Sequence, residues 1–311
     1  MEKSLQLADG RRWGLRACGE TRQWADEFGR IMGMGACDGI PDASLRLIRV
    51  SPCPGRGVPP WWSPPEGYPG EGWRVRISPG LELWSHPEVK ETIGGLGEYH
   101  DRESILYQMR FALYPLYEET VLQGGLPIHA ALLEHEGRGI LLAGRSEVGK
   151  STACRRVPVP WKALGDDLAL IVRDASGRYH AHALPTWSIL RSGQQDRTWN
   201  VGRSVPVAGI FFLVQAETDE TVSPGGGAAS VMLDSASMMV FRSVNSVSGP
   251  IDGSPLRRNV YSNAASMVSS VPCFVLRLSL TGRFWEKIEE VLEKADRGLT
   301  LDRRELKAHG G

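Results

Sequence analysis

The first third of the chain contains short strand-like segments and one helical segment. Residues 73–78, WRVRIS, alternate apolar and charged side chains, as a half-exposed strand does. Segments 45–50 and 81–85 are also rich in apolar residues and are expected to form strands. In residues 102–119 apolar side chains recur at helical spacing, and Pro115 is expected to end or kink that helix. The pattern predicts a small N-terminal α+β domain.

The rest of the chain is richer in strand and turn patterns. Two apolar runs flank Glu136-Gly137 within residues 128–144, and two more flank the turn 174–177 within residues 168–183. Each segment therefore predicts an antiparallel hairpin. The further expected elements are strands at 209–215 and 273–280, a mobile glycine-rich loop at 223–230, and a helix at 284–296.

These patterns divide the chain into three expected parts. Residues 1–118 are expected to form the N-terminal α+β domain, residues 119–297 a second α/β domain with a mixed, antiparallel-rich sheet, and residues 298–311 a flexible tail.

Trp61 and Trp62 lie in a stretch so rich in proline and glycine that a continuous helix or central strand is excluded. Two interpretations stay open: the tryptophans anchor this loop on its own domain, or they help to grip a peptide.

Charge, hydropathy and cysteine content limit which kinds of partner, location and metal site the sequence favours. The 311 residues contain 36 Lys+Arg and 36 Asp+Glu, so the chain lacks the basic excess that favours nucleic acid as a partner. No apolar run approaches the roughly 18 residues of a membrane-spanning helix, and the N-terminus lacks the apolar stretch of a secretory signal. We therefore expect a cytoplasmic protein. The five cysteines are scattered, which does not favour a zinc site or a disulfide framework.

Residues 144–151, GRSEVGKS, form a pattern that is typical of phosphate binding. Glycines let backbone N–H groups approach phosphate oxygens, Lys150 would reach the outer phosphates, and Ser151 Oγ would ligate magnesium. The alternative is a glycine-containing turn between a strand and a helix. The predicted nucleotide-binding residues are Gly144, Arg145, Ser146, Glu147, Val148, Gly149, Lys150, Ser151 and Thr152.

An acid pair, Asp166-Asp167, follows this motif closely. Pro158 and Pro160 end the intervening helix, and too few residues remain for an ordinary crossover to a parallel strand. We therefore expect the chain to turn back to the motif, with the acid pair at the start of a strand. Adjacent residues there point to opposite faces, so one carboxylate can hold magnesium with Ser151 while the other accepts a proton from an attacking hydroxyl. The alternative is a turn or helix-cap pair.

Other candidate residues lie before and after the motif. His129 begins the strand that pairs with the one leading into the motif, so it is expected near the phosphates, as a donor or as a group that tunes Asp166. The alternative is a structural histidine. Arginines in loop-like sequence could stabilise charge on a transferred group, and Arg257 and Arg258 are favoured. The full set of these candidates is Arg191, Arg197, Arg203, Arg257 and Arg258.

The string IHAALLEHEGRGILLAGRSEVGKST…LGDD resembles the catalytic domain of HPr kinase/phosphorylase, over roughly residues 125–215. The resemblance implies a fold similar to phosphoenolpyruvate carboxykinase. It also implies Asp166 as general base, Asp167 and Ser151 as magnesium ligands, Lys150 on the phosphates of ATP, and His129 near the transferred group. The chain departs from that family in three respects: HAHALPTWSILR stands where an E-x-R-G-x-G signature is usual, Glu147 replaces a loop glycine, and residues 1–118 match nothing in that family.

The whole chain resembles the SynChlorMet cassette protein C group still more, in the stretches GGLPIHAALLE, GKSTACRR and HALPTWS. These are kinase-like proteins encoded with peptide-modifying radical enzymes. The resemblance implies an ATP- and Mg²⁺-dependent kinase that phosphorylates a Ser or Thr hydroxyl of a ribosomally made precursor peptide. Other enzymes of the same cassette are possible partners, and a homo-oligomer stays open. The alternatives are a nucleotide-binding peptide-recognition protein without kinase activity, and a kinase of a small metabolite such as a free amino acid.

Overall fold

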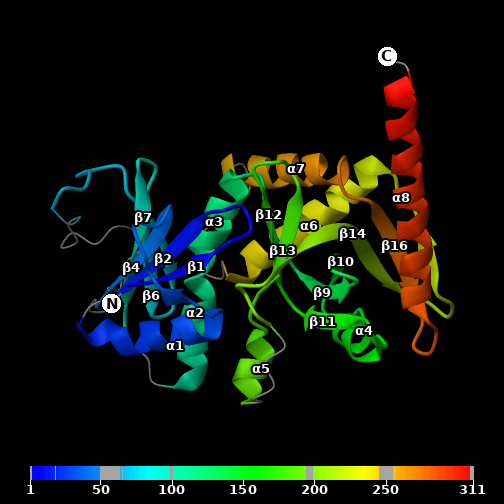
Figure 1. The fold of residues 1–311 in the computed structure, drawn as a ribbon. Helices are drawn as coiled ribbons and strands as arrows, with labels where there is room; N and C mark the ends of the chain where they lie inside the picture. The colour runs from blue at the N-terminus through cyan, green and yellow to red at the C-terminus, as the bar shows by residue number, and fades with distance from the viewer. Residues whose placement is uncertain are drawn as a thin grey trace.

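Two β-sheets stand side by side, and helices α2 (Arg102–Phe111) and α3 (Tyr114–Leu122) run between them (Figure 1). The computed structural model describes residues 2–17, 19–49, 64, 66–98, 101–193, 199–244 and 255–308, with the backbone alone at 243–244, 296 and 298–308. One continuous core of buried side chains extends from the first sheet through both helices to the second sheet. The two halves therefore pack as a single body around α2 and α3.

The first sheet is seven-stranded, in the order β3-β1-β2-β4-β7-β6-β5. Its central strands β2, β4 and β7 are parallel, and the outer pairs are antiparallel. After the short 3₁₀ helix η1 (Gly19–Thr21), helix α1 (Arg22–Met32) packs on β2, and its C-cap is Gly33, whose φ of 67° favours glycine. The strands are β1 (Glu2–Gln6), β2 (Arg12–Ala17), β3 (Gly35–Ala36), β4 (Ala43–Arg49), β5 (Arg74–Ser78), β6 (Leu81–His86) and β7 (Val89–Leu96).

The second sheet is nine-stranded, with the path β11-β9-β10-β14-β13-β12-β8 and with β16 and β15 joined beside β14. Strand β14 is parallel to β10 and β16, whereas the other pairs are antiparallel. The strands are β8 (Leu126–Ile128), β9 (Ala130–His135), β10 (Arg138–Ala143), β11 (Lys162–Gly165), β12 (Ala169–Arg173), β13 (Tyr179–Ala183), β14 (Ser204–Gln215), β15 (Glu220–Val222) and β16 (Cys273–Leu278).

Helices bury both faces of this second sheet. Side chains of α3, α6 (Gly226–Val244) and α7 (Pro255–Val268) belong to the core shared with the first sheet, whereas α4 (Lys150–Arg156) and α8 (Phe284–Ala308) contribute to a second core. Successive residues of β9 and β10 alternate between these cores, as the pleat of a strand requires. Ala130, Leu132, Leu141 and Ala143 face the shared core, and Ala131, Leu133, Ile140 and Leu142 face the second.

The mixed α/β architecture and the mixed second sheet agree with the expected fold class. Both expected hairpins are present, as β9–β10 and β12–β13. Glu136 and Gly137 form the first turn, with positive φ angles of 52° and 76° that suit a tight hairpin. The similarity to phosphoenolpyruvate carboxykinase stays a prediction.

The expected topology around the acid pair was wrong in one respect. A short strand, β11, precedes Asp166, and it pairs antiparallel with β9, as β10 does. Strand β11 therefore runs in the same direction as β10, with β9 between them, so the chain does cross over to a parallel strand. The sequence KALG gave little sign of a strand because it has only four residues and no β-branched side chain. The carboxyl ends of β10 and β11 consequently lie at the same edge of the sheet.

Two local expectations also need correction. Helix α6 begins at Gly226, inside the stretch expected to be a glycine-rich loop, because the apolar residues that follow pack into the shared core. The single helix expected over residues 102–119 is two helices, interrupted at Ala112 and Leu113, and Pro115 lies in the first turn of α3, where proline needs no N–H partner. The expected domain boundary after residue 118 falls inside α3, and α8 continues to Ala308, past the expected start of the tail. The domain division and the tail's flexibility stay predictions.

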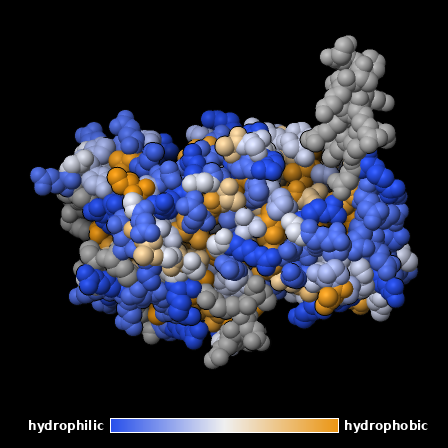
Figure 2. All heavy atoms as spheres, viewed as in Figure 1, coloured by the Kyte–Doolittle hydropathy of each residue, from blue (hydrophilic) through white to orange (hydrophobic). Residues whose placement is uncertain are grey.

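The surface face seen in Figure 2 is dominated by hydrophilic residues, with hydrophobic residues in small separate patches. Among the described helices, none combines the length and apolar character needed to cross a membrane. Trp61 and Trp62, which were considered for gripping a peptide, lie outside the described residues.

Candidate functional site

The glycine loop, residues 144–149, connects the carboxyl end of β10 to α4. Gly144 cannot readily be replaced, because a Cβ atom there would lie 2.8 Å from Val148 Cγ1. Gly149 has a φ of 114°, which L side chains rarely adopt, and Glu147 lies in the left-handed region at 66°. The carbonyl of Glu147 accepts a hydrogen bond from Gln215 Nε2 at 3.0 Å. The sequence therefore specifies a tightly folded loop.

Lys150 is buried at the end of this loop. Its Nζ donates hydrogen bonds to the carbonyl oxygens of Gly144 at 2.8 Å and Arg145 at 2.9 Å. Burial lowers the pKa of Lys150, while the charges of Asp167 and Asp166 oppose that shift. The loop thus holds a cation close to two carboxylates.

The acid pair lies between β11 and β12, and its two carboxylates have different partners. Thr186 Oγ1 donates a hydrogen bond to Asp166 Oδ1 at 2.8 Å. Asp167 Oδ1 lies 3.1 Å from His129 Nε2. Because each carboxylate is held by a residue from a separate part of the chain, the two are not equivalent.

Asp167 is biased toward its ionised form. Burial alone would raise its pKa, but the hydrogen bond and charge of His129, together with Arg110 and Lys150, outweigh burial and lower the pKa below the ordinary value. His129 is fixed in turn through its backbone: its N–H donates to the carbonyl of Ala236 on α6 at 3.1 Å. His129 was expected to tune Asp166, but the side chain with which it makes contact is Asp167.

One cavity of about 250 Å³ brings most of the predicted residues together. Gly144, Arg145 and Val148 belong to the loop without lining this cavity, and Val148 packs against the second core instead. Thr186 and Ser188, at the start of α5 (Trp187–Ser192), line it although neither was singled out from sequence. The lining residues are His129, Ser146, Glu147, Gly149, Lys150, Ser151, Thr152, Asp166, Asp167, Thr186 and Ser188.

The donor atoms in this cavity suit a hard cation. The hydroxyl of Ser151 and the carboxylates of Asp166 and Asp167 are oxygen donors, which Mg²⁺ prefers, and it commonly binds through one or two carboxylates plus substrate phosphates. The described residues contain no group of three or more His, Cys, Asp or Glu that could hold a metal alone. The oxygen donors of this cavity therefore fit a hard cation such as Mg²⁺.

The candidate arginines are engaged elsewhere or exposed. Arg257 pairs with Asp234, Arg203 with Glu134, and Arg191 lies 3.7 Å from Glu103. Arg258 is exposed, and Arg197 lies outside the described residues. None of the four described arginines lines the cavity.

Arg110 on α2, which sequence reasoning missed, is the arginine whose charge acts on Asp167. Its position in a helix nearly sixty residues before the acid pair leaves no local signal.

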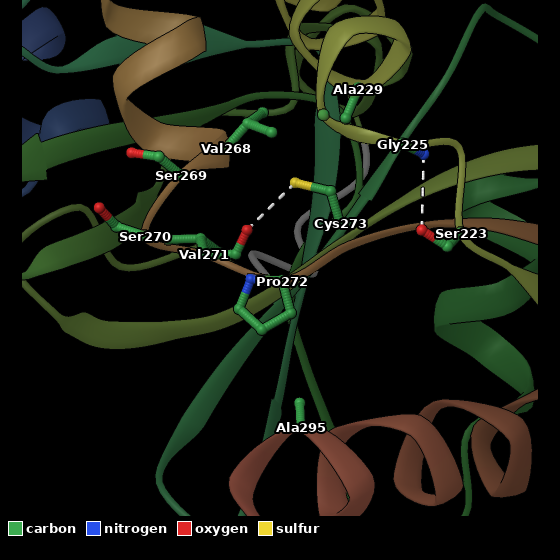
Figure 3. A pocket seen from close by; sticks show the side chains of 11 residues that line it. Ser223, Gly225, Ala229, Val268, Ser269, Ser270, Val271, Pro272, Cys273 and Ala295 are labelled. Carbon is green, nitrogen blue, oxygen red and sulfur yellow. Dashed lines mark hydrogen bonds between the residues drawn. The ribbon is translucent and has the colours of Figure 1, made fainter. Parts of the chain in front are cut away.

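A second cavity, of about 330 Å³, lies beside the start of α6 and β16 (Figure 3). Its lining contains small and apolar residues and no charged side chain. Cys273 donates through Sγ to the carbonyl of Val271 at 3.4 Å, and burial raises the pKa of its thiol to about 12. The lining residues are Ser223, Gly225, Gly226, Ala229, Val268, Ser269, Ser270, Val271, Pro272, Cys273 and Ala295.

The fold and the site together define a mixed α/β protein in which a glycine loop, a buried lysine and an acid pair meet at one cavity. The family model described as SynChlorMet cassette protein ScmC matches residues 93–293. This is well over half of the chain, so the protein belongs to that family. The matched region begins in β7 and includes α2, α3 and the second sheet. No curated protein matches the chain.

Proposed function

We propose that the protein is an ATP- and Mg²⁺-dependent kinase that transfers the γ-phosphoryl group to a Ser or Thr hydroxyl. The observation that carries this proposal is the meeting of Lys150, Ser151 and the acid pair in one cavity, beside a glycine loop. Phosphoryl transfer depends mainly on positioning and on stabilising charge, and these residues offer a cation, oxygen donors for Mg²⁺ and a candidate base.

Asp166 is the proposed general base. Its Oδ1 is occupied by the hydroxyl of Thr186, so Oδ2 is the oxygen available to an incoming hydroxyl group. In the transfer, the acceptor oxygen forms a bond to the γ-phosphorus, the bond from that phosphorus to the β–γ bridging oxygen breaks, and ADP leaves. The proton of the acceptor hydroxyl passes to Asp166.

Asp167 and Ser151 are the proposed Mg²⁺ ligands. Bound Mg²⁺ would neutralise part of the charge of the phosphates. His129 fixes Asp167 through the 3.1 Å contact with its Oδ1, which leaves the second carboxylate oxygen for the metal. Lys150 lines the same cavity and supplies the positive charge that attracts the phosphates. The proposed nucleotide contacts are those of the glycine loop and Thr152.

The proposed acceptor is a ribosomally made precursor peptide of the same cassette. Support comes from the resemblance to HPr kinase/phosphorylase, together with membership of a cassette protein family. The function implies a cytoplasmic location, where ATP is available, and other enzymes of the cassette as partners. A nucleotide-binding recognition protein and a kinase of a free amino acid are the competing functions.

The test is incubation of the protein with MgATP and each candidate acceptor, followed by mass spectrometry. The kinase proposal predicts that the precursor peptide gains the mass of one phosphate and that free serine and threonine do not. The Asp166→Asn variant should bind ATP in calorimetry and transfer phosphate at a greatly reduced rate. Binding without transfer by the wild-type protein would favour the recognition protein, and phosphate on the free amino acid would favour the metabolite kinase.

A further inference from the structure

Thr186 stands at a position where a threonine side chain usually serves its own helix. It is the N-cap residue of α5, and its carbonyl accepts hydrogen bonds from Ile189 N–H at 3.2 Å and Leu190 N–H at 3.4 Å. A capping threonine normally accepts an N–H of the first helical turn with its side-chain oxygen. Here the side chain makes no capping hydrogen bond, and its hydroxyl donates to Asp166 instead.

The backbone around Thr186 is fixed against the acid pair. The N–H of Leu184 donates to the carbonyl of Leu168 at 3.0 Å, so the two segments run alongside each other. Gly165 makes this approach possible, because a Cβ atom there would lie only 3.0 Å from Ala183 Cβ. The residues on either side of the acid pair are therefore tied to the segment that leads into α5.

Burial of Thr186 protects its hydrogen bond to Asp166 from competition by water. Thr186 is only 2% exposed, so little water competes for its hydroxyl group. Asp166 is partly exposed in the cavity, as a group that must meet an acceptor requires. Helix α5 is itself held in place, since it packs against α2 and buries Trp187 and Leu190. The hydroxyl of Thr186 is thus presented to Asp166 by a fixed scaffold.

We propose that Thr186 is a positioning residue that acts through Asp166, holding Oδ1 so that Oδ2 faces the acceptor hydroxyl. This inference rests on the proposed function and deepens it, because it assigns the start of α5 to the acceptor side of the site. Ser188 lies in the same wall of the cavity. The stretch HALPTWS, which stands where the related kinases carry a different signature, then has a stated chemical role.

The test uses the full chain, MgATP and the precursor peptide. Thr186→Val keeps the shape of the side chain and removes the hydroxyl, and we expect kcat to fall about 10- to 100-fold, as is usual for residues that orient a functional group. KM for MgATP should stay unchanged. Thr186→Ser restores the hydroxyl and should recover most of kcat.

Thr120→Val is the matched control, because it makes the same chemical change at another buried threonine. The hydroxyl of Thr120 donates to the carbonyl of Leu116 in α3, at 2.8 Å, within its own helix. This variant should transfer phosphate at the wild-type rate. Wild-type kcat in Thr186→Val would overturn the inference, as would a Thr186→Ser variant as slow as Thr186→Val. If the wild-type protein transfers no phosphate to any acceptor, the proposed function fails and this inference fails with it.

Discussion

Two cavities of comparable volume, about 250 Å³ and about 330 Å³, differ completely in the chemistry of their walls. The smaller one collects a lysine, a histidine and two aspartates from three separate segments of the chain. The larger one is lined by glycine, serine and apolar residues, and its cysteine has a raised thiol pKa. The comparison teaches that convergent charged groups, more than volume, mark a candidate catalytic site.

Apart from loss of the proposed base Asp166, the largest effect is expected when the smaller cavity loses its positive charge. Lys150→Met should reduce phosphate transfer about 100- to 1,000-fold, because both the charge that attracts phosphate and the hydrogen bonds to Gly144 and Arg145 are lost. MgATP affinity should fall as well, which calorimetry can measure. Wild-type affinity and transfer in this variant would exclude the smaller cavity as the nucleotide site.

The next largest effect should come from Asp167→Asn. The neutral amide weakens both the contact with His129 and the proposed Mg²⁺ site, so the apparent Mg²⁺ affinity should fall about 10- to 100-fold. Titration of transfer activity with Mg²⁺ at saturating ATP provides the measurement. An unchanged Mg²⁺ requirement would assign the metal to other ligands.

A smaller effect is expected at His182, which supports the fold away from both cavities. Burial lowers its pKa, although its hydrogen bond with the carbonyl of Val201, at 2.7 Å, opposes the shift. Its Nε2 accepts the N–H of Ala8 at 3.1 Å, so the neutral form joins the two sheets. The unfolded chain binds a proton more readily, and the stability should therefore decrease as pH falls below about 6.5.

His182→Gln is the variant that isolates this pH dependence. Glutamine does not titrate and can keep a donor and an acceptor near the same positions. Chemical denaturation at pH 7.5 and pH 5 should show a smaller loss of stability in the variant than in the wild-type protein. Equal losses would mean that His182 does not contribute to acid destabilisation.

The smallest effect is expected in the larger cavity. Ser270→Phe places a large side chain at its exposed wall and should leave MgATP affinity and phosphate transfer unchanged. Steady-state kinetics beside the Lys150→Met variant provides the check. A strong loss of transfer in Ser270→Phe would show that the larger cavity takes part in the function.

The candidate residues that lie close together in the sequence could be predicted from the sequence alone. The glycine loop and the acid pair lie within 24 residues of each other, so spacing and residue type were enough to select them, and His129 followed from the hairpin. Thr186 and Ser188 could not be selected, because the packing of α5 against α2 holds them at the cavity, and Arg110 could not be selected, because its charge acts on Asp167 from a helix far away in the sequence. The favoured Arg257 proved to be paired with Asp234 instead.

In the fold, too, the elements defined by neighbouring residues were predicted, whereas those that depend on tertiary contacts were missed. Hairpins β9–β10 and β12–β13 were predicted because both apolar runs and a turn signal lie close together in the sequence. Strand β11 was missed because its strand character comes from pairing with β9, and α6 because burial of its apolar residues overrides the weak helix propensity of its glycines.

The most direct test of the central claim compares the wild-type protein with Asp166→Asn at saturating MgATP and precursor peptide. The phosphorylated fraction of the peptide is measured by mass spectrometry over time, and ATP binding by both proteins is measured by calorimetry. The account predicts a phosphopeptide with the wild-type protein and a rate about 100- to 10,000-fold lower with Asp166→Asn, at similar ATP affinity. Equal rates of phosphopeptide formation by the two proteins would contradict it.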